Sequence, residues 1–296
     1  RPGIAALMKA SASANQPVDA EAIAFRLAPR INAAGRLVHA RMACELLLTD
    51  NQTKADRLAA ALCRLNTRRR SMETELLTAI TEGFERSPRP AKRSVLVVDG
   101  HHWHEGILGI VAARLTRRFN CPSVVISTRN GIGKASARSV EHLDLTAALN
   151  QCADLLDRFG GHPMAAGLVL PSANIGRFRS RLEAVVNRMT DTTRTGPILR
   201  IDAHVPLSEL NATLMENLDR LGPFGQGNPP PLFMDNQVQV TGSKIVAQCH
   251  RKMVLQGSAG GSFTAIQFNV ENASTAAPER FEKIAYRPQW NHWNGQ

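Results

Sequence analysis

The pattern of apolar and polar positions predicts three successive parts in the chain. Between residues 53 and 84, apolar residues recur at spacings of mostly three, four or seven, which is the stripe of one long amphipathic helix. Such a helix would be about 50 Å long and would suit a connection between domains. The segment before it, residues 19–50, also has a helical pattern, in which we expect Pro29 to end one helix and to open the polar segment 30–37.

A proline-rich break at residues 87–90 leads into an alternation of strand and helix patterns. Apolar runs at 94–99 and 123–127 flank an amphipathic stretch at 106–119, and together they predict a βαβ unit. Further strands are expected at 133–138 and 164–170, with helices at 144–158 and 174–189. The middle of the chain is therefore predicted to be a compact α/β domain.

The last third of the chain has a different pattern. After Gly196 and Pro197 we expect a strand at 199–205 and a helix at 207–221, followed by a loop rich in glycine and proline. Short strands with polar turns are then expected at 237–246, 252–256, 263–269 and 281–286. This succession is typical of a small β-barrel or sandwich.

Charge and cysteine content narrow the possible functions. The 36 lysines and arginines outnumber the 25 acidic residues, which gives a net charge of +11 and a pI near 10.2. A polyanion is the natural partner of such a chain, and a merely solubilising surface is the alternative. The five cysteines form no C-x-x-C pair, and no apolar run approaches the roughly 20 residues that cross a bilayer. We therefore expect a cytoplasmic protein without a membrane partner.

The first candidate site is the predicted strand at 133–138. Alternate side chains of a strand lie on one face, so Lys134, Ser136 and Arg138 should share a face. Two cations that flank a hydroxyl, with alanines between them, suit a phosphate group. An exposed edge strand with polar outward residues is the alternative interpretation.

Two turns are further candidates. Gly160, Gly161 and His162 follow a predicted helix, where the glycines would either cap the helix or let a nucleotide approach the backbone. His104 lies where the first βαβ strand turns into its helix, and a helix N-terminus favours anions. The acidic and histidine neighbours of His104 match no metal-ligand spacing, so we expect no metal there.

The segment 30–37 is the fourth candidate. Arg30, Asn32 and Arg36 place two cations and an amide around a glycine. They would contact a phosphate or nucleotide, or only bind a neighbouring domain.

Four segments, in this order, resemble the DHH phosphoesterase superfamily and, within it, the RecJ family. They are Pro-Arg-Ile-Asn-Ala-Ala-Gly-Arg-Leu at 29–37, Trp-His-Glu-Gly at 103–106, Lys-Ala-Ser-Ala-Arg-Ser at 134–139 and Gly-Gly-His-Pro-Met-Ala-Ala-Gly at 160–167. The segment Leu-Gly-Pro-Phe-Gly-Gln-Gly-Asn-Pro at 221–229 resembles the start of the OB-fold domain of that family. The resemblance covers essentially the whole chain.

The resemblance implies an α/β fold in which a long linker helix precedes a DHHA1 domain and a partial OB-fold barrel follows it. The implied boundaries are the end of a DHH domain at 1–50, the connecting helix at 51–90, the DHHA1 domain at 91–192 and a C-terminally incomplete OB-fold domain at 193–296. Because the chain begins with Arg1 rather than methionine, we expect it to be part of a longer protein.

The resemblance also implies roles for individual residues. Those expected to bind the 5′-terminal phosphate of the substrate are Arg36, Ser136, Arg138, Gly161 and His162. Those expected to contact DNA elsewhere are Arg30, Asn32, His104, Lys134, Ser139, Lys244, Arg251 and Lys252, with stacking by Phe224, Phe233 and Phe263.

The implied function is the substrate-binding portion of a 5′-to-3′ single-stranded-DNA exonuclease in DNA recombination and repair. In that family two Mn²⁺ or Mg²⁺ ions are held by aspartates and an Asp-His-His motif that would precede residue 1. We therefore expect no catalytic or metal-binding residue in this chain, which should bind DNA without cutting it. The implied partners are single-stranded DNA, single-strand binding protein and a repair helicase, and the chain should be monomeric. The alternatives are a stand-alone single-stranded nucleic-acid-binding module and a nanoRNA or pAp phosphatase of the same superfamily.

Overall fold

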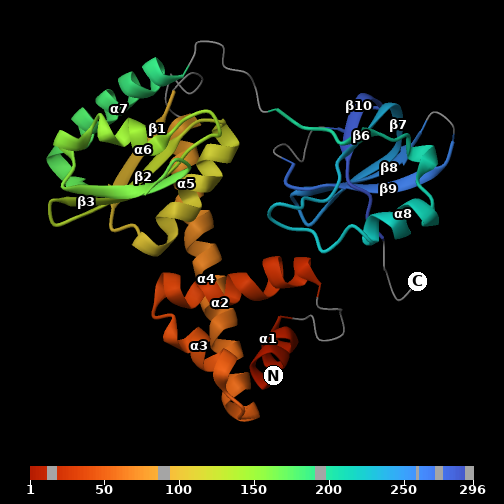
Figure 1. The fold of residues 1–296 in the computed structure, drawn as a ribbon, viewed down its shortest axis with the longest axis horizontal. Helices are drawn as coiled ribbons and strands as arrows, with labels where there is room; N and C mark the ends of the chain where they lie inside the picture. Colours follow the sequence, from red (N-terminus) through yellow and green to blue (C-terminus); the bar gives the residue numbers. More distant parts are fainter. Residues whose placement is uncertain (12–18, 86–93, 191–197, 258–259, 271–275, 291–296) are drawn as a thin grey trace. The chain divides into compact units, whose positions relative to one another are not determined.

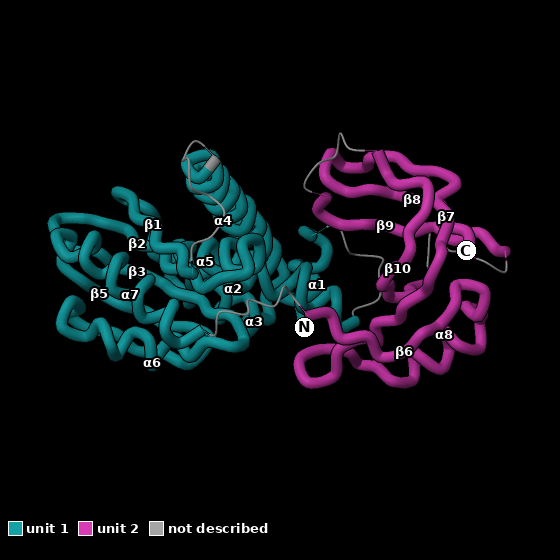
Figure 2. The backbone as a smooth tube through the Cα atoms, turned by 90° about the horizontal axis from the view of Figure 1, so that it is seen from above, with its two compact units in different colours: residues 1–197 teal, residues 198–296 magenta. Residues whose placement is uncertain are grey.

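The computed structural model describes residues 1–11, 19–85, 94–190, 198–257, 260–270 and 276–290. The chain forms two compact units, residues 1–197 and 198–296, which Figure 2 shows in separate colours. The expected breaks at 87–90 and at residues 196–197 lie outside the described residues.

The first part of unit 1 is helical (Figure 1). Its α-helices are α1 (Pro2–Ala10), α2 (Ala28–Leu37), α3 (Arg41–Leu48) and α4 (Gln52–Glu85). The first three pack along one half of α4 around a core that includes Leu7, Leu46 and Leu62. The long amphipathic helix predicted from the apolar stripe is confirmed by α4.

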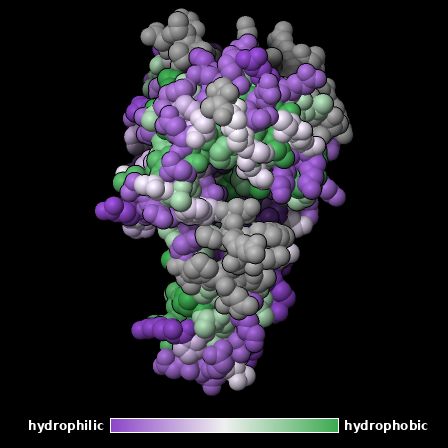
Figure 3. Space-filling view, turned by 90° about the vertical axis from the view of Figure 1, so that its right-hand side faces the viewer, coloured by the Kyte–Doolittle hydropathy of each residue, from purple (hydrophilic) through white to green (hydrophobic). Residues whose placement is uncertain are grey.

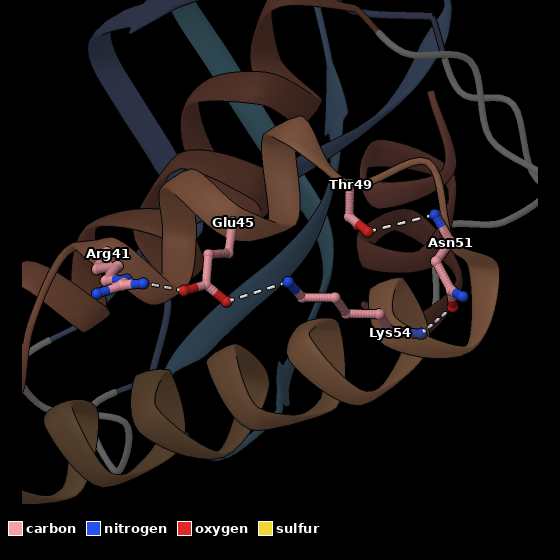
Figure 4. Close-up of polar contacts among 5 residues, drawn as sticks. All are labelled: Arg41, Glu45, Thr49, Asn51 and Lys54. Carbon is pink, nitrogen blue, oxygen red and sulfur yellow. Dashed lines mark hydrogen bonds and ion pairs between the residues drawn. The ribbon is translucent and has the colours of Figure 1, made fainter.

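Polar contacts fix the point at which α4 begins. The side chain of Asn51 accepts a hydrogen bond from the N–H of Lys54 at 2.8 Å, and the Thr49 hydroxyl accepts one from the N–H of Asn51 at 3.2 Å (Figure 4). Glu45 of α3 pairs with Arg41 at 2.9 Å and with Lys54 at 3.4 Å. Hydrogen bonds from Arg41 and then Lys54 lower the pKa of the Glu45 carboxyl. Asn51 thus caps α4, and Glu45 ties α3 to its first turn.

The expected end of a helix at Pro29 is wrong. Helical backbone runs from a π-helical segment, Ala22–Leu27, directly into α2, with Pro29 in the first turn of α2. A proline lacks the N–H that an α-helix uses, and the wider π turn before it accommodates this loss. The polar segment 30–37 is therefore part of a helix.

The second part of unit 1 is an α/β domain whose five-stranded sheet has the order β1-β2-β3-β5-β4. The strands are β1 (Leu96–His101), β2 (Ser123–Arg129), β3 (Ile132–Arg138), β4 (Arg158–His162) and β5 (Ala165–Pro171). Strands β1 and β2 are parallel and are joined by α5 (Glu105–Phe119), which confirms the predicted βαβ unit. The other neighbouring strands are antiparallel.

Different helices cover the two faces of this sheet. On one face lie α6 (Leu145–Asn150) and α7 (Ile175–Met189), where Phe178 and Leu182 share an apolar core with Ile126 and Leu168. On the other face α5 packs against β2 and β3, and against the second half of α4. We call this second side the α5 face.

The helix expected at 144–158 is mostly absent. The Asp144 carboxylate accepts a hydrogen bond from the N–H of Ala147 at 3.0 Å and caps α6, which ends at Asn150. A 3₁₀ turn, Ala153–Leu155, follows, and the chain then enters the edge strand β4.

The interpretation of the glycines at 160–161 as a helix cap is therefore wrong. They lie within β4, where Gly161 has a φ of 153° and a Cβ would meet the carbonyl oxygen of Ala165 at 2.3 Å. Glycine is required there by the close approach of β5.

Unit 2 is built on a second sheet of order β10-β7-β8-β9, with β6 paired to β7. Its elements are β6 (Ala203–His204), α8 (Ala212–Asp219), β7 (Phe233–Val246), β8 (His250–Gln256), β9 (Ser262–Gln267) and β10 (Arg280–Tyr286). All pairs are antiparallel except β6 with β7. Val238, Met253 and Leu255 form the centre of a small apolar core.

Two expected elements in unit 2 are shorter than predicted. The strand expected at 199–205 is reduced to β6, and the helix expected at 207–221 divides into a 3₁₀ turn, Leu207–Glu209, and α8. The Tyr286 hydroxyl donates to the carbonyl of Val205 at 2.6 Å, which joins the end of β10 to the segment after β6.

One side of the surface is mainly polar. Figure 3 shows one side on which hydrophilic residues predominate and hydrophobic residues are scattered between them. Large exposed apolar side chains include Phe25 in unit 1, at 75%, and Phe268 in unit 2, at 65%. None of the helices in the described ranges is both long and apolar enough to cross a membrane.

Candidate nucleic-acid interface

Strand β3 presents its polar residues as the sequence predicts. Burial alternates along it, and Ala135 and Ala137 belong to the core on the α6 and α7 side. Lys134, Ser136 and Arg138 therefore lie together on the α5 face. The predicted shared face is confirmed.

The register of β3, β5 and β4 extends this face into three rows. Directly opposed residues of antiparallel strands lie on the same side of a sheet. The rows are Lys134, Val169 and Arg158; Ser136, Gly167 and Gly160; and Arg138, Ala165 and His162. His162 thus shares the face of Ser136 and Arg138, but it lies two strands from Arg138, about 10 Å across the sheet.

Arg36 reaches the α5 face because glycines in α5 leave room. A Cβ on Gly106 would lie 1.9 Å from the carbonyl oxygen of Arg36, so the contact between α2 and the start of α5 requires glycine. Nη1 of Arg36 in turn donates to the carbonyl of Gly106 at 3.3 Å. One turn along, a Cβ on Gly109 would lie 2.9 Å from Nη2 of Arg138. The segments 29–37, 103–106 and 134–139 thus meet around the first turns of α5.

Arg36 and Arg138 bring two positive charges close together. Burial and then the charge of Arg36 lower the pKa of Arg138. Arg138 donates to the carbonyl of Ala137 at 2.8 Å, and no ion pair is recorded for either arginine within the described part of the chain. Like charges at short range are unfavourable unless an anion neutralises them. The arrangement therefore favours a phosphate beside this pair.

A buried carboxylate on α4 binds two more arginines near Arg36. The side chain of Glu73 is 1% exposed and pairs with Arg69 at 2.7 Å and with Arg114 of α5 at 2.7 Å. Burial, and then repulsion by Arg36 among other arginines, lower the pKa of Arg69, whereas Glu73 raises it. One carboxylate therefore neutralises only part of the positive charge where α2, α4 and α5 meet, and it fastens α4 to α5.

A hollow of about 380 Å³ opens on the α5 face beside Ser136. Its lining includes Glu105 of α5, Lys134 and Ser136 of β3, Arg158 and Gly160 of β4, and Gly167 of β5. A Cβ added to Gly160 would meet nothing within 4 Å, and one added to Gly167 would come no closer than 3.8 Å to another atom. The two glycines therefore form an open floor, and the hollow has the size of a small-ligand site.

Arg158 is a lining residue that sequence reasoning missed. A helix was expected to end at Arg158, so this residue was not expected to lie on the sheet. Read as a strand, the alternation of Arg158, Gly160 and His162 would have placed all three on one side.

Ser139 does not present its hydroxyl to the α5 face, which corrects the expected DNA contact. Its side chain is 5% exposed, and its hydroxyl donates to the carbonyl of Leu143 at 2.7 Å. His104 is the N-cap of α5, and its Nδ1 accepts a hydrogen bond from the N–H of Gly106 at 3.1 Å. A DNA contact by His104 stays a prediction beside this structural role.

The remaining expected residues of unit 1 lie apart from the rows. Arg30 donates to the carbonyl of Arg26 within its own helical run, and Asn32 is exposed on α2. Gly161 alternates with Gly160 and His162 and pairs with the core residue Ala166, so its contribution is the close backbone contact with β5.

The expected residues of unit 2 divide between the two faces of its sheet. Lys244 and Lys252 are directly opposed on β7 and β8, and Lys244 is exposed. Arg251 is only 6% exposed, because it alternates with Lys252 and lies on the side of the core residue Met253. The expected surface role of Arg251 is therefore corrected.

The aromatic residues of unit 2 also differ from expectation. Phe233 is 6% exposed and packs edge-on against Tyr286, with ring centroids 6.1 Å apart, so its expected stacking role is wrong. Phe268, which sequence reasoning missed, packs edge-on against His250 at 5.2 Å. Because β8 and β9 are antiparallel, His250 and Phe268 lie on the same face as Lys252.

The described residues do not fit a two-metal centre. They contain no group of three or more His, Cys, Asp or Glu side chains that could hold a metal ion. Asp99 forms an ion pair with Arg179, and Nδ1 of His101 lies 2.8 Å from the Thr128 hydroxyl. No metal-dependent step can be derived from these side chains.

Family models match both domains of the chain. The DHHA1 domain model matches residues 92–188, and the RecJ OB domain model matches residues 201–296. The first contains the three rows and the hollow, and the second contains the sheet of unit 2. The expected fold class is confirmed, with a DHHA1 domain after the long helix and a partial OB-fold barrel after that.

Known proteins match over the whole chain. The single-stranded-DNA-specific exonuclease RecJ of Bacillus subtilis is 31% identical over 301 residues, which are 100% of this chain and 38% of that protein. Crystal structures of RecJ from Thermus thermophilus in complex with Mg²⁺ and with Mn²⁺ each match with a TM-score of 0.80 and 29% identity. Both cover 100% of this chain, and 44% and 42% of those chains.

The chain thus spans less than half of the length of these relatives. Its full-length similarity to RecJ proteins, its two domain matches and its fold agree with one another. The chain is thus similar, over its whole length, to a part of RecJ proteins that includes a DHHA1 domain and a RecJ OB domain.

Proposed function

We propose that this chain is the strand-binding portion of a RecJ-like nuclease that degrades single-stranded DNA from its 5′ end in recombination and repair. The observation that carries the proposal is that Arg36 and Arg138 both lie against the first turns of α5, at Gly106 and Gly109, with Ser136 on the same open sheet face. A terminal phosphate monoester carries about −1.5 to −2 charges near neutral pH, more than an internal phosphodiester. Clustered arginines therefore prefer the phosphorylated end.

His162 and the glycine floor would serve the nucleotide that follows this phosphate. His162 lies on the same face as Arg138, and the floor of Gly160 and Gly167 leaves the backbone accessible. A sugar or base can approach such a surface closely. The role of these residues is to bind and orient the strand.

Hydrolysis would need residues outside the described part of this chain. We propose Mn²⁺ or Mg²⁺, the ions bound to RecJ in the T. thermophilus crystal structures, as the cofactor of the complete enzyme. Such ions activate a water for attack on a phosphodiester. Residues 1–50 would be the end of the DHH domain that holds them, and the chain by itself would bind without cutting.

Unit 2 would hold the strand through charge and stacking. Lys244, Lys252 and the exposed Phe268 share one face of its sheet. Lysines bind the backbone, and an aromatic side chain stacks on any base. Single-strand binding protein and a repair helicase stay predicted partners.

A stand-alone binding module is the second candidate, because the site described here is one of binding alone. A nanoRNA or pAp phosphatase is less well supported, since those proteins usually lack an OB domain and residues 201–296 match one. The two functions differ in whether the protein made from the complete reading frame hydrolyses DNA or only binds it.

The test has two parts. The purified chain is titrated with 5′-phosphorylated and 5′-hydroxyl single strands of the same sequence and with duplex DNA, and we expect tightest binding to the phosphorylated single strand. The protein made from the complete reading frame is then given the same strand with Mn²⁺, and we expect release of nucleotides from the 5′ end. Equal binding of all three DNAs would contradict end recognition, and binding without hydrolysis by the complete protein would favour the module.

A further inference from the structure

The hollow contains a cation that recognition of the 5′ end does not use. Arg158 is exposed on the edge strand β4, lines the hollow, and has no ion pair recorded within the described ranges. It belongs to the row of Lys134, whereas Arg138 belongs to the row four residues along β3. These two rows are about 13 Å apart, so one phosphate beside Arg138 and Arg36 is distant from the backbone of Arg158.

The space between these rows is the open part of the hollow. Its middle row consists of Ser136, Gly167 and Gly160, which provide one hydroxyl and otherwise only backbone. No side chain of Gly160 or Gly167 fills this space. A Cβ added to Gly160 would meet nothing within 4 Å, and one added to Gly167 would come no closer than 3.8 Å to another atom. A sugar and base fit a hollow of about 380 Å³, and cations would then flank them in both outer rows.

Lys134 is partly neutralised, and Arg158 is the stronger candidate for a phosphate. Nζ of Lys134 pairs with Glu105 at 2.9 Å, and both side chains are about half exposed, at 48% and 58%. An exposed pair of this kind is weak and can exchange partners. The guanidinium of Arg158 offers a two-pronged donor, and the carboxylate in the described lining, that of Glu105, is paired with Lys134.

We propose that Arg158, assisted by Lys134, binds an internal phosphate of the strand whose 5′-terminal phosphate lies at Arg36 and Arg138. The inference rests on the proposed function. On this inference the DHHA1 domain binds the first nucleotides of the strand as well as its terminal phosphate. The terminal phosphate lies in one outer row, a nucleoside lies over the glycine floor, and a later phosphate lies in the other outer row.

The test uses Arg158→Gln in the full chain with two matched variants. Arg177→Gln removes an exposed arginine from α7, which covers the opposite face of the sheet, and Arg138→Gln removes the end-binding arginine. Each is titrated with a nucleoside 5′-monophosphate and with a 5′-phosphorylated oligonucleotide. A second oligonucleotide series replaces one internal linkage at a time by a neutral methylphosphonate.

For Arg158→Gln we expect about fivefold to tenfold weaker binding of the oligonucleotide, as for one charge-assisted contact. Its slope of log K against log salt should flatten by about 0.7. Binding of the nucleoside monophosphate should be unchanged. At one position in the oligonucleotide, the methylphosphonate should weaken binding by the unmodified chain and leave binding by Arg158→Gln unchanged.

Two results would overturn the inference. One is a loss for Arg158→Gln no larger than that for Arg177→Gln, and the other is an equal loss on the monophosphate and the oligonucleotide. Failure of the proposed function is distinguishable, because Arg138→Gln would then also leave binding of the phosphorylated strand unchanged.

Discussion

Arg36, in the last turn of α2, lies close enough to Arg138, at the end of β3, for their charges to repel each other. The two residues come from the helical part and from the sheet of unit 1. Their approach depends on Gly106, which admits the backbone of Arg36, and on Gly109, over which the Arg138 guanidinium lies. A phosphate between two such arginines would relieve their repulsion.

Replacing Gly106 by alanine should separate the two arginines. The new Cβ would lie 1.9 Å from the carbonyl oxygen of Arg36, so α2 must move away from α5. We expect unit 1 to lose about 1–3 kcal/mol of stability and the chain to lose its preference for 5′-phosphorylated strands. Urea unfolding and the binding titration measure the two effects. Gly176→Ala, where a Cβ meets nothing within 4 Å, is the control; it should leave the preference for 5′-phosphorylated strands unchanged and should not lower the stability, because alanine favours a helix more than glycine does.

The Glu73 carboxylate should be essential for the junction of α4 with α5. Glu73→Gln leaves Arg69, whose side chain is 12% exposed, and Arg114 without their shared counter-charge. We expect a loss of about 3 kcal/mol in the free energy of unfolding, as for other broken buried ion pairs. Glu75→Gln, at an exposed position of the same helix that accepts a hydrogen bond from Ser71, should cost less than about 0.5 kcal/mol. Equal stability of the two variants in urea would argue against the role of Glu73.

Phe268 should contribute stacking to the binding of single strands. It is 65% exposed and lies on the face of Lys252, so a base can reach its ring. Phe268→Ala should weaken binding of an oligonucleotide by about 1–3 kcal/mol without changing the salt dependence, because stacking releases no counterions. Phe25→Ala, which removes a ring that is 75% exposed from unit 1, is the control. A similar loss in both variants would show that Phe268 has no special part.

Tyr286 should titrate at unusually high pH. Burial, and then the charges of Asp235 and Glu209, raise its pKa to about 12. Because the protonated form is the neutral one, its contribution to stability is complete below the unfolded pKa of about 10 and is lost as the pH rises through about 12. Tyr286 is the only tyrosine in the sequence, so absorbance at alkaline pH reports on it alone. A midpoint near 10 in the folded chain would contradict the burial of its hydroxyl at Val205.

The sequence pattern was enough to predict an element where its apolar residues repeat with the period of a helix or of a strand. The apolar stripe of α4 and the alternation of Lys134, Ser136 and Arg138 each follow from a repeat within a single element, and both were predicted. The edge strand β4 was missed, because Gly160 and Gly161 have no side chains to show alternation and fit a helix cap equally well.

Burial of polar residues depended on contacts that no local pattern contains. Ser139 is turned inward by its bond to Leu143, and Arg251 lies on the core side of β8 because the register of β7 and β8 places it there. The continuation of the helix through Pro29 depends on a π turn, which has no simple sequence signal. The approach of Arg36 to Arg138 likewise required the packing of α2 on α5.

The most direct test of the phosphate site is a double-mutant cycle on Arg36 and Arg138. Affinities of the unchanged chain, Arg36→Ala, Arg138→Ala and the double variant are measured with 5′-phosphorylated and 5′-hydroxyl strands. We expect each single variant to lose about 1–3 kcal/mol on the phosphorylated strand, and the double variant to lose less than the sum, because one phosphate is shared. On the hydroxyl strand the losses should be small. Additive losses of the same size on both strands would contradict a site for the 5′ end.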